Sequence, residues 1–138
     1  EYPVLTGAAM QATAYVVRAT SVNGQDGPRA ESIRFYDVTA ILLGVAALAV
    51  VLATARTVRR RPWDGLLVAA SPVLLLTATI NWDLLAVAAT SLAILAWSRR
   101  RSGFAGLFIG IGAALKLYPV LLLGPLLLVA LRCWARRP

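Results

Sequence analysis

The sequence predicts an all-α fold, a polytopic transmembrane helical bundle of about five membrane helices with an N-terminal in-plane or interfacial helix. Apolar residues make up 59% of the chain, against about 45–50% in soluble domains, and the mean hydropathy is +0.74. The apolar residues are gathered into blocks that suit a bilayer better than a small soluble core. Arginine triplets at residues 59–61 and 99–101 stand at the ends of two blocks, as is typical of membrane helices.

The positions of the charges indicate a membrane topology and not a nucleic-acid surface. The chain has 14 Lys and Arg against 6 Asp and Glu, a net charge of +8. Most basic residues flank the apolar blocks on one expected side, and the exceptions are Arg18, Arg29, Arg34 and Lys116. Because Lys and Arg are enriched on the cytoplasmic side, we expect a multi-pass cell-membrane protein with cytoplasmic triplets and no nucleic-acid partner.

Cysteine and histidine usage excludes several chemistries. Cys133 is the single cysteine and histidine is absent, so an intrachain disulfide, a cysteine metal cluster, His-ligated zinc and a histidine base are excluded. We expect no cofactor and no metal ligand in this chain. The chain opens without Met or a basic leader, and we expect it to be an internal piece of a longer protein.

Segment lengths and flanks predict the membrane helices. A spanning helix needs about 20 apolar residues. Residues 38–55 should run inward and end at Arg56, and residues 63–80 should return outward with a kink at Pro72. Residues 84–98 should run inward again. This last segment is short for a membrane span, so we expect its helix to include residues from the preceding turn at 81–83.

The apolar stretch at residues 103–134 is too long for one span, and Lys116 and Pro119 divide it. We expect an outward helix at 103–117 and an inward helix at 119–131, since proline is tolerated in a first helical turn. Gly106 and Gly110 form a GxxxG pair. Small residues at this spacing predict a close approach of two helix backbones.

The N-terminal part has a different character. Residues 3–17 are apolar but form a short segment for a membrane span, and Arg18 follows them. This pattern favours a helix that lies in the outer membrane interface. Residues 19–36 should form an irregular outer loop, with turns at Asn23-Gly24 and Gly27-Pro28. We therefore divide the chain into an outer-face helix and loop, residues 1–37, and a transmembrane helical bundle, residues 38–138.

With this topology, polar side chains gather at the outer face: Glu1, Tyr2, Asp37, Asn81, Trp82, Asp83, Lys116 and Tyr118. An unpaired charge at membrane depth is costly, so we expect Asp83 and Lys116 to pair. Lys116 either extends its stem to the headgroups or binds a lipid phosphate as a point charge. The tripeptide at 81–83 either holds a polar substrate or is a turn with Trp82 as an interfacial anchor.

Three short motifs carry a resemblance to a family. Glu1-Tyr2-Pro3, Asn81-Trp82-Asp83 and Leu115-Lys116-Leu117-Tyr118-Pro119 occur in this order. The chain resembles GT-C type integral membrane glycosyltransferases, and most closely glycosyltransferase family 87, which includes polyprenyl-phosphate-mannose-dependent mannosyltransferases of actinobacteria. That family's Tyr-Pro motif and its Lys-Leu-x-Pro motif at an outer helix end correspond to Tyr2-Pro3 and to residues 116–119.

The resemblance implies transfer of a sugar, mannose, from a polyprenyl-phosphate donor to a hydroxyl of a glycan or glycolipid acceptor at the outer face of the cell envelope. Membrane lipids are further expected partners. It implies a catalytic base upstream of Glu1, and the chain alone would then be inactive. The expected substrate-binding residues are Lys116, Tyr118, Asp83, Asn81, Trp82, Tyr2 and Glu1. Asp83 should orient Lys116 or a sugar hydroxyl.

The alternative functions are a transporter and a non-catalytic structural membrane subunit. A transporter should carry polar residues along a path through several helices. The predicted helix interiors are instead nearly all Ala, Leu, Val and Gly, which favours a site near the membrane surface.

Overall fold

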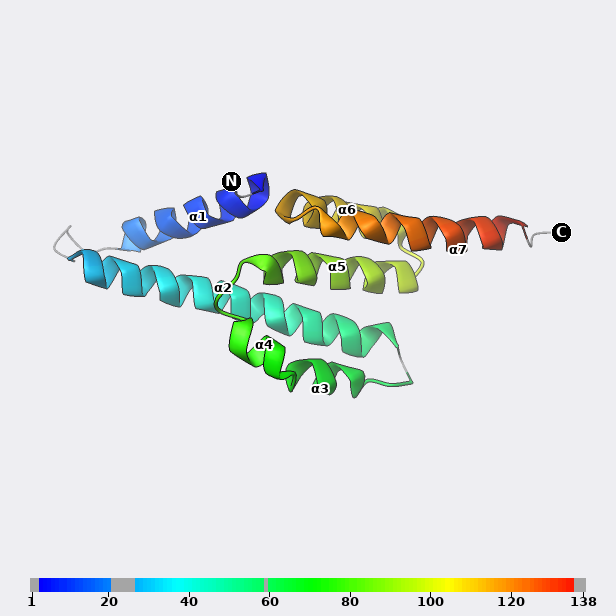
Figure 1. The fold of residues 1–138 in the computed structure, drawn as a ribbon, viewed down its shortest axis with the longest axis horizontal. Coiled ribbons are helices and arrows are strands. Elements are labelled where there is room, and N and C mark those ends of the chain that lie inside the picture. Colours follow the sequence, from blue (N-terminus) through cyan, green and yellow to red (C-terminus); the bar gives the residue numbers. More distant parts are fainter. Residues whose placement is uncertain (1–2, 21–26, 59, 136–138) are drawn as a thin grey trace.

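The computed structural model describes residues 3–20, 27–58 and 60–135 of the chain, and every regular element within them is a helix (Figure 1). The elements are α1 (Val4–Thr20), α2 (Pro28–Thr57), α3 (Asp64–Ala69), α4 (Pro72–Thr77), α5 (Asp83–Ser98), α6 (Ser102–Leu115), the 3-10 helix η1 (Tyr118–Leu122) and α7 (Leu123–Ala135). The all-α prediction is confirmed for the described residues.

Helix α5 is the centre of the bundle. It packs against α2 on one side and forms an antiparallel hairpin with α6 on the other (Figure 1). The α2–α5 contact is a buried cluster of Leu43, Ala46 and Val50 from α2 with Leu84 and Ala88 from α5. Spacings of three and four residues place these side chains on one stripe of each helix.

The α5–α6 hairpin is close because its contact residues are small. A Cβ added at Gly112 would lie 3.0 Å from two side-chain atoms of Pro119 and 3.4 Å from the Cβ of Ala89. Nothing in the described part of the chain lies within 4 Å of a Cβ added at Gly106 or Gly110, so the described helices do not make the close approach predicted for this pair. The close approach is therefore made by Gly112.

Helix α2 begins at Pro28, so the expectation of an irregular loop up to residue 36 is wrong. Proline favours the first turn because its φ is fixed and its missing N–H would have no intrahelical partner there. Glu31 lies in the same turn, where the helix dipole favours an acidic side chain. The expected turn at Asn23-Gly24 lies outside the described residues. Helix α2 continues through residues 37 and 38, the point at which the sequence predicts the division of the chain. The division itself stays a prediction.

The single helix expected at residues 63–80 is also wrong, because the segment consists of two short helices, α3 and α4. Ser71 between them is extended, with ψ 123°. The next residue, Pro72, disfavours a helical conformation for Ser71 and has no N–H for a helix hydrogen bond. Each helix has 6 residues, about 9 Å of length, and neither alone crosses a bilayer.

The division at Lys116 and Pro119 is confirmed. Helix α6 ends at Leu115, residues 116 and 117 form the link, and η1 leads into α7. Among the described residues, Pro28–Thr57 and Tyr118–Ala135 are long and apolar enough to cross a membrane, while Asp83–Ser98 and Ser102–Leu115 are shorter apolar helices. The expected number of about five membrane helices is not confirmed.

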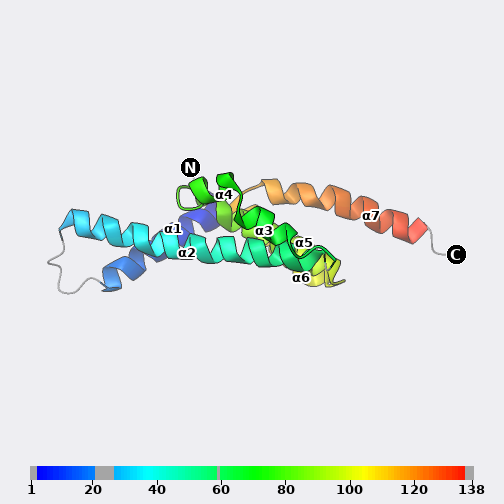
Figure 2. The same cartoon turned by 90° about the horizontal axis from the view of Figure 1, so that it is seen from below.

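Helix α1 runs antiparallel to the first part of α2, beyond the end of α5 at which Asp83 lies (Figures 1 and 2). Arg18 Nε lies 3.9 Å from Glu31 Oε1 across this pair. The expected N-terminal helix is thus present, and its orientation in a bilayer stays a prediction.

Candidate functional site

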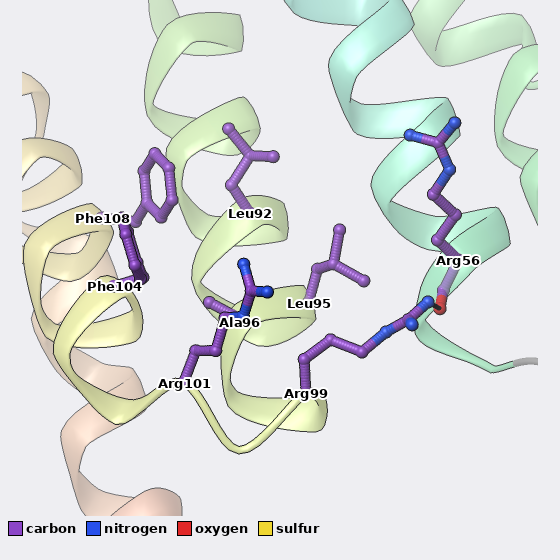
Figure 3. Close-up of a pocket in the computed structure, with 8 residues that line it drawn as sticks. All are labelled: Arg56, Leu92, Leu95, Ala96, Arg99, Arg101, Phe104 and Phe108. Carbon is purple, nitrogen blue, oxygen red and sulfur yellow. Dashed lines mark hydrogen bonds between the residues drawn. The ribbon is translucent and has the colours of Figure 1, made fainter.

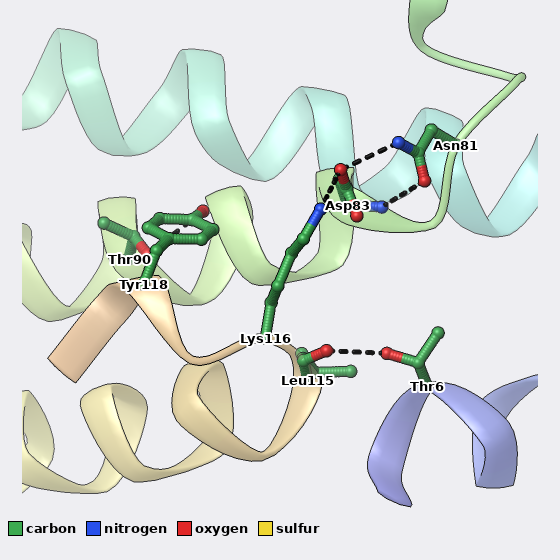
Figure 4. Close-up of polar contacts among 7 residues, drawn as sticks. All are labelled: Thr6, Asn81, Asp83, Thr90, Leu115, Lys116 and Tyr118. Carbon is green, nitrogen blue, oxygen red and sulfur yellow. Dashed lines mark hydrogen bonds and ion pairs between the residues drawn. The ribbon is translucent and has the colours of Figure 1, made fainter. Parts of the chain in front are cut away.

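A polar cluster lies where α5 begins and α6 ends. Because the two helices are antiparallel, Asp83 at the start of α5 comes next to Lys116, which follows α6. The ammonium of Lys116 donates to Oδ2 of Asp83 (Figure 4). The predicted pairing is therefore confirmed. The Lys116 and Asp83 side chains are 46% and 39% exposed, so the pair remains accessible.

The two helix ends favour the charges that stand on them. Asp83 lies in the first turn of α5, where unpaired N–H groups give a partial positive charge, and Lys116 caps the C-terminus of α6, where carbonyls give a partial negative one. The backbone N–H of Lys116 also donates to the Gly112 carbonyl at 2.7 Å. The end of α6 thus fixes the point from which the lysine side chain extends.

Asn81 holds the carboxylate of Asp83 from the other side. Its side-chain N–H donates to Asp83 Oδ2 at 2.7 Å, and its Oδ1 accepts the backbone N–H of Asp83 at 3.3 Å. Asparagine commonly closes a turn by bonding the backbone two residues on. Oδ2 of Asp83 consequently accepts from both Asn81 and Lys116, which fixes the orientation of the carboxylate (Figure 4).

The remaining predicted residues lie less centrally. The hydroxyls of Thr90 and Tyr118 are 3.5 Å apart, a long hydrogen bond. Thr90 lies two turns along α5 from Asp83, about 10 Å by helix rise, so Tyr118 borders the cluster without joining it (Figure 4). Trp82 is half-buried at the N-cap of α5. Glu1 and Tyr2 lie outside the described residues.

Thr6 is a neighbour of the cluster that the sequence does not predict. Its hydroxyl donates to the Leu115 carbonyl at 2.8 Å, and the residue is 5% exposed. The last carbonyls of a helix lack intrahelical partners, and Thr6 satisfies one of them. Helix α1 thereby docks on the helix end that carries Lys116.

A hollow of about 630 Å³ opens beside Asn81 and Asp83, between α3, α4 and the start of α5. This volume lies within the range of about 300–1,000 Å³ of small-molecule sites. Its lining is mostly apolar, with Leu67, Leu74 and Val87 among the contributors, and Ser71 at the helix break also faces it. The break at Pro72 therefore shapes a groove that ends on the polar cluster.

Within residues 3–20, 27–58 and 60–135, there is no group of three or more His, Cys, Asp or Glu side chains that could hold a metal ion. The cation at the cluster is the ammonium of Lys116.

Large apolar side chains cover the outside of the helices, among them Ile41, Leu66, Leu76 and Leu128. Together with the two long apolar stretches, they define an integral membrane protein with a polar cluster at its helix ends. Residues 31–137 match glycosyltransferase family 87, and the chain belongs to this family. No curated protein and no solved structure matches the chain.

Family membership confirms the resemblance and favours a membrane glycosyltransferase over a transporter or a structural subunit. The matched region contains Asn81-Trp82-Asp83 and the Lys116–Pro119 segment, but Tyr2-Pro3 precedes it.

Proposed function

We propose that the full-length protein transfers mannose from a polyprenyl phosphate to a hydroxyl of a glycan or glycolipid at the outer membrane surface, with Lys116 binding the donor phosphate. The observation that carries the proposal is the Lys116–Asp83 pair beside a mostly apolar hollow. A polyprenyl phosphate has the matching chemistry, an anionic head on an apolar chain. Membership of family 87 supports the glycosyl transfer itself.

The reaction makes one bond and breaks another. The acceptor oxygen bonds to the anomeric carbon of the sugar, and the bond from that carbon to the phosphate oxygen breaks. The electron pair leaves with the lipid phosphate, and the hydroxyl proton passes to a carboxylate base, which we expect upstream of Glu1. Negative charge on the phosphate grows along this path, so a fixed cation stabilises the transition state more than the ground state.

Lys116 is suited to this task. An ammonium has three N–H donors, and Asp83 accepts one of them. The partly exposed side chain can direct the others to phosphate oxygens. Asp83 acts as a positioning residue and not as the base, because its Oδ2 already accepts from Lys116 and Asn81.

The hollow supplies the complementary apolar surface. Leu67 and Leu74 line it on one side and Val87 on the other, which suits the first prenyl units of the donor. Asn81 and Asp83 at its edge mark where the apolar chain gives way to the polar head.

The test is sugar transfer from a radiolabelled polyprenyl-phosphate mannose in membranes that contain the full-length protein. Lys116→Ala and Lys116→Gln should lower turnover by roughly a hundredfold, the typical cost of losing one preorganised charge-stabilising donor. Lys116→Arg should retain part of the activity, since it keeps the charge but changes the geometry.

Arg18→Gln is the matched control, because it removes a cation from the same expected face at a side chain that is 77% exposed. This variant should stay near wild-type activity. If Lys116 only extends its side chain to the lipid headgroups, Lys116→Gln should have nearly wild-type sugar-transfer activity. Full activity of Lys116→Gln at normal protein levels would therefore contradict the phosphate role.

A further inference from the structure

A second cavity, of about 620 Å³, lies at the opposite end of the α5–α6 hairpin (Figure 3). Three arginines line it, Arg56, Arg99 and Arg101. The other lining residues are apolar: Leu92, Leu95, Ala96, Phe104 and Phe108. None of the described lining residues is acidic, so the cavity combines a cationic rim with an apolar floor.

The end of α2 and the end of α5 are joined across this cavity. Arg99 donates from Nη2 to the backbone carbonyl of Arg56 at 3.1 Å (Figure 3). That carbonyl belongs to the last turn of α2, where carbonyls lack helical partners. The contact uses the Arg56 backbone, and the Arg56 guanidinium points along α2, away from those of Arg99 and Arg101 (Figure 3).

The turn between α5 and α6 decides which arginines line the cavity. The N–H groups of Arg100 and Arg101 donate to the carbonyls of Trp97 and Ala96, each at 2.9 Å, a Schellman-type helix end. Arg100 has φ 59° at the position that glycine normally takes. The chain reverses there, so Arg99 and Arg101 both line the cavity, and Arg100 borders a different one.

We propose that this cavity binds an anionic phospholipid of the leaflet on which the arginines lie, which is the cytoplasmic leaflet in the predicted topology. The lipid phosphate lies at the cationic rim to which Arg56, Arg99 and Arg101 contribute, and an acyl chain lies along Leu92, Phe104 and Phe108. Arginine binds phosphate oxygens through paired N–H groups, and basic pockets between membrane helices bind acidic headgroups.

The apolar floor selects a lipid over a soluble phosphate. Inorganic phosphate would satisfy the arginines but would leave Phe104 and Phe108 against water, whereas an acyl chain covers them. The site stands at the other end of the hairpin from Lys116, and the proposal does not depend on the sugar-transfer function.

The experiment is native mass spectrometry of the purified full-length protein in detergent, titrated with phosphatidylglycerol or with phosphatidylcholine of the same acyl chains. The wild-type protein should bind phosphatidylglycerol more tightly. The double variant Arg56→Gln/Arg101→Gln should weaken that binding about 25-fold, about fivefold for each arginine near an anionic headgroup. Binding of phosphatidylcholine should not change.

Arg132→Gln is the matched control, because it removes one charge near the same expected membrane face from a residue outside the cavity lining. It should change the affinity for phosphatidylglycerol less than about twofold. A loss of fivefold or more in this variant would show attraction by general surface charge and would overturn the proposal.

Two further measurements use only the wild-type protein, so they do not depend on whether a variant folds. Equal affinity of the wild-type protein for the two lipids would overturn the proposal. Inorganic phosphate in large excess should not displace phosphatidylglycerol, and displacement at equal concentration would identify a soluble-phosphate site instead. Stronger binding of phosphatidylglycerol that resists phosphate supports the lipid site.

Discussion

An ammonium and a carboxylate at two neighbouring helix ends would each be costly to leave unpaired near the hydrocarbon boundary. Exposed ion pairs nevertheless contribute only about 0–1 kcal/mol to stability, and the Lys116 and Asp83 side chains are 46% and 39% exposed. The main effect of the pair is therefore on position. Asp83 keeps the ammonium at the edge of the hollow.

Asp83→Asn should accordingly lower sugar transfer far more than stability. We expect a loss of less than about 1 kcal/mol in unfolding free energy and a clear fall in turnover, because Lys116 loses the charge that orients it. The measurement is a double-mutant cycle of transfer rates. If Asp83 acts through Lys116, Asp83→Asn/Lys116→Gln is no slower than Lys116→Gln alone. Multiplied losses in the double variant would show that Asp83 acts independently.

At the residue scale, the sequence predicts the contacts of charges better than those of hydroxyls. Asp83 and Lys116 stand at the same expected depth, and electrostatic cost alone implies that they meet. The Thr6 and Thr90 hydroxyls lie in apolar stretches, where a threonine can bond its own helix backbone. Their contacts to Leu115 and Tyr118 depend on how whole helices dock, and local sequence does not encode this.

At the scale of elements, Gly112 joins the packing of the hairpin to the site. Gly112→Ala would place a Cβ 3.0 Å from the Pro119 ring, which is too close without a shift of η1. Because Lys116 N–H donates to the Gly112 carbonyl, the shift would also move the lysine. We expect a loss of about 1–3 kcal/mol in stability and reduced sugar transfer.

Gly106→Ala is the control for this variant, since nothing described lies within 4 Å of its added Cβ. Alanine should stabilise this helix by up to about 1 kcal/mol. Thermal unfolding in detergent measures both variants. Equal effects at the two glycines would contradict the packing role of Gly112.

The element boundaries follow from the sequence where one residue dominates. Helix α6 ends just before Lys116, and Pro119 lies in the first turn of η1, so the two residues mark the division as predicted. Helix α5 begins at Asp83, within the preceding turn at residues 81–83. Pro72 separates α3 from α4 completely, although its sequence position alone is equally consistent with a kink. The sequence does not predict the start of α2 at Pro28, because a polar helix and a polar loop have similar compositions.

At the scale of the whole molecule, the hairpin has two chemically distinct ends. Helices α5 and α6 have 16 and 14 residues, about 24 and 21 Å of length, and the hydrocarbon core is about 30 Å thick. In the predicted topology, both ends of the hairpin would lie at or just inside the boundaries of the bilayer. One end carries Asp83 and Lys116, and the other carries Arg99, Arg100 and Arg101.

The sequence predicts this separation of charges because arginine clusters mark helix ends regardless of how the helices pack. The number of about five membrane helices that the sequence also predicts is not confirmed. The segment at residues 63–80 has the composition of a span, but the break at Pro72 divides it. Composition reports the environment of a segment, whereas local backbone geometry decides whether the segment is one helix.

The topology leads to a prediction for the intact cell. Because Lys and Arg clusters remain cytoplasmic, Lys116 should face outward and the arginines inward. Leu117→Cys and Arg60→Cys, each in a Cys133→Ser background, report the two ends. Leu117 is 79% exposed beside Lys116, and Arg60 is also exposed. A membrane-impermeant thiol reagent should label Leu117→Cys in intact cells and Arg60→Cys only after permeabilisation.

Cys133→Ser alone is the control and should take up no label at either stage. The wild-type Cys133, which is exposed near the end of α7, should behave like Arg60→Cys and react only in permeabilised cells. Labelling of Arg60→Cys in intact cells would show that the topology is the reverse of the predicted one. The Lys116 cluster would then face the cytoplasm and the arginine cavity the outer leaflet, so the donor and the anionic phospholipid would each have to reach the protein from the opposite side.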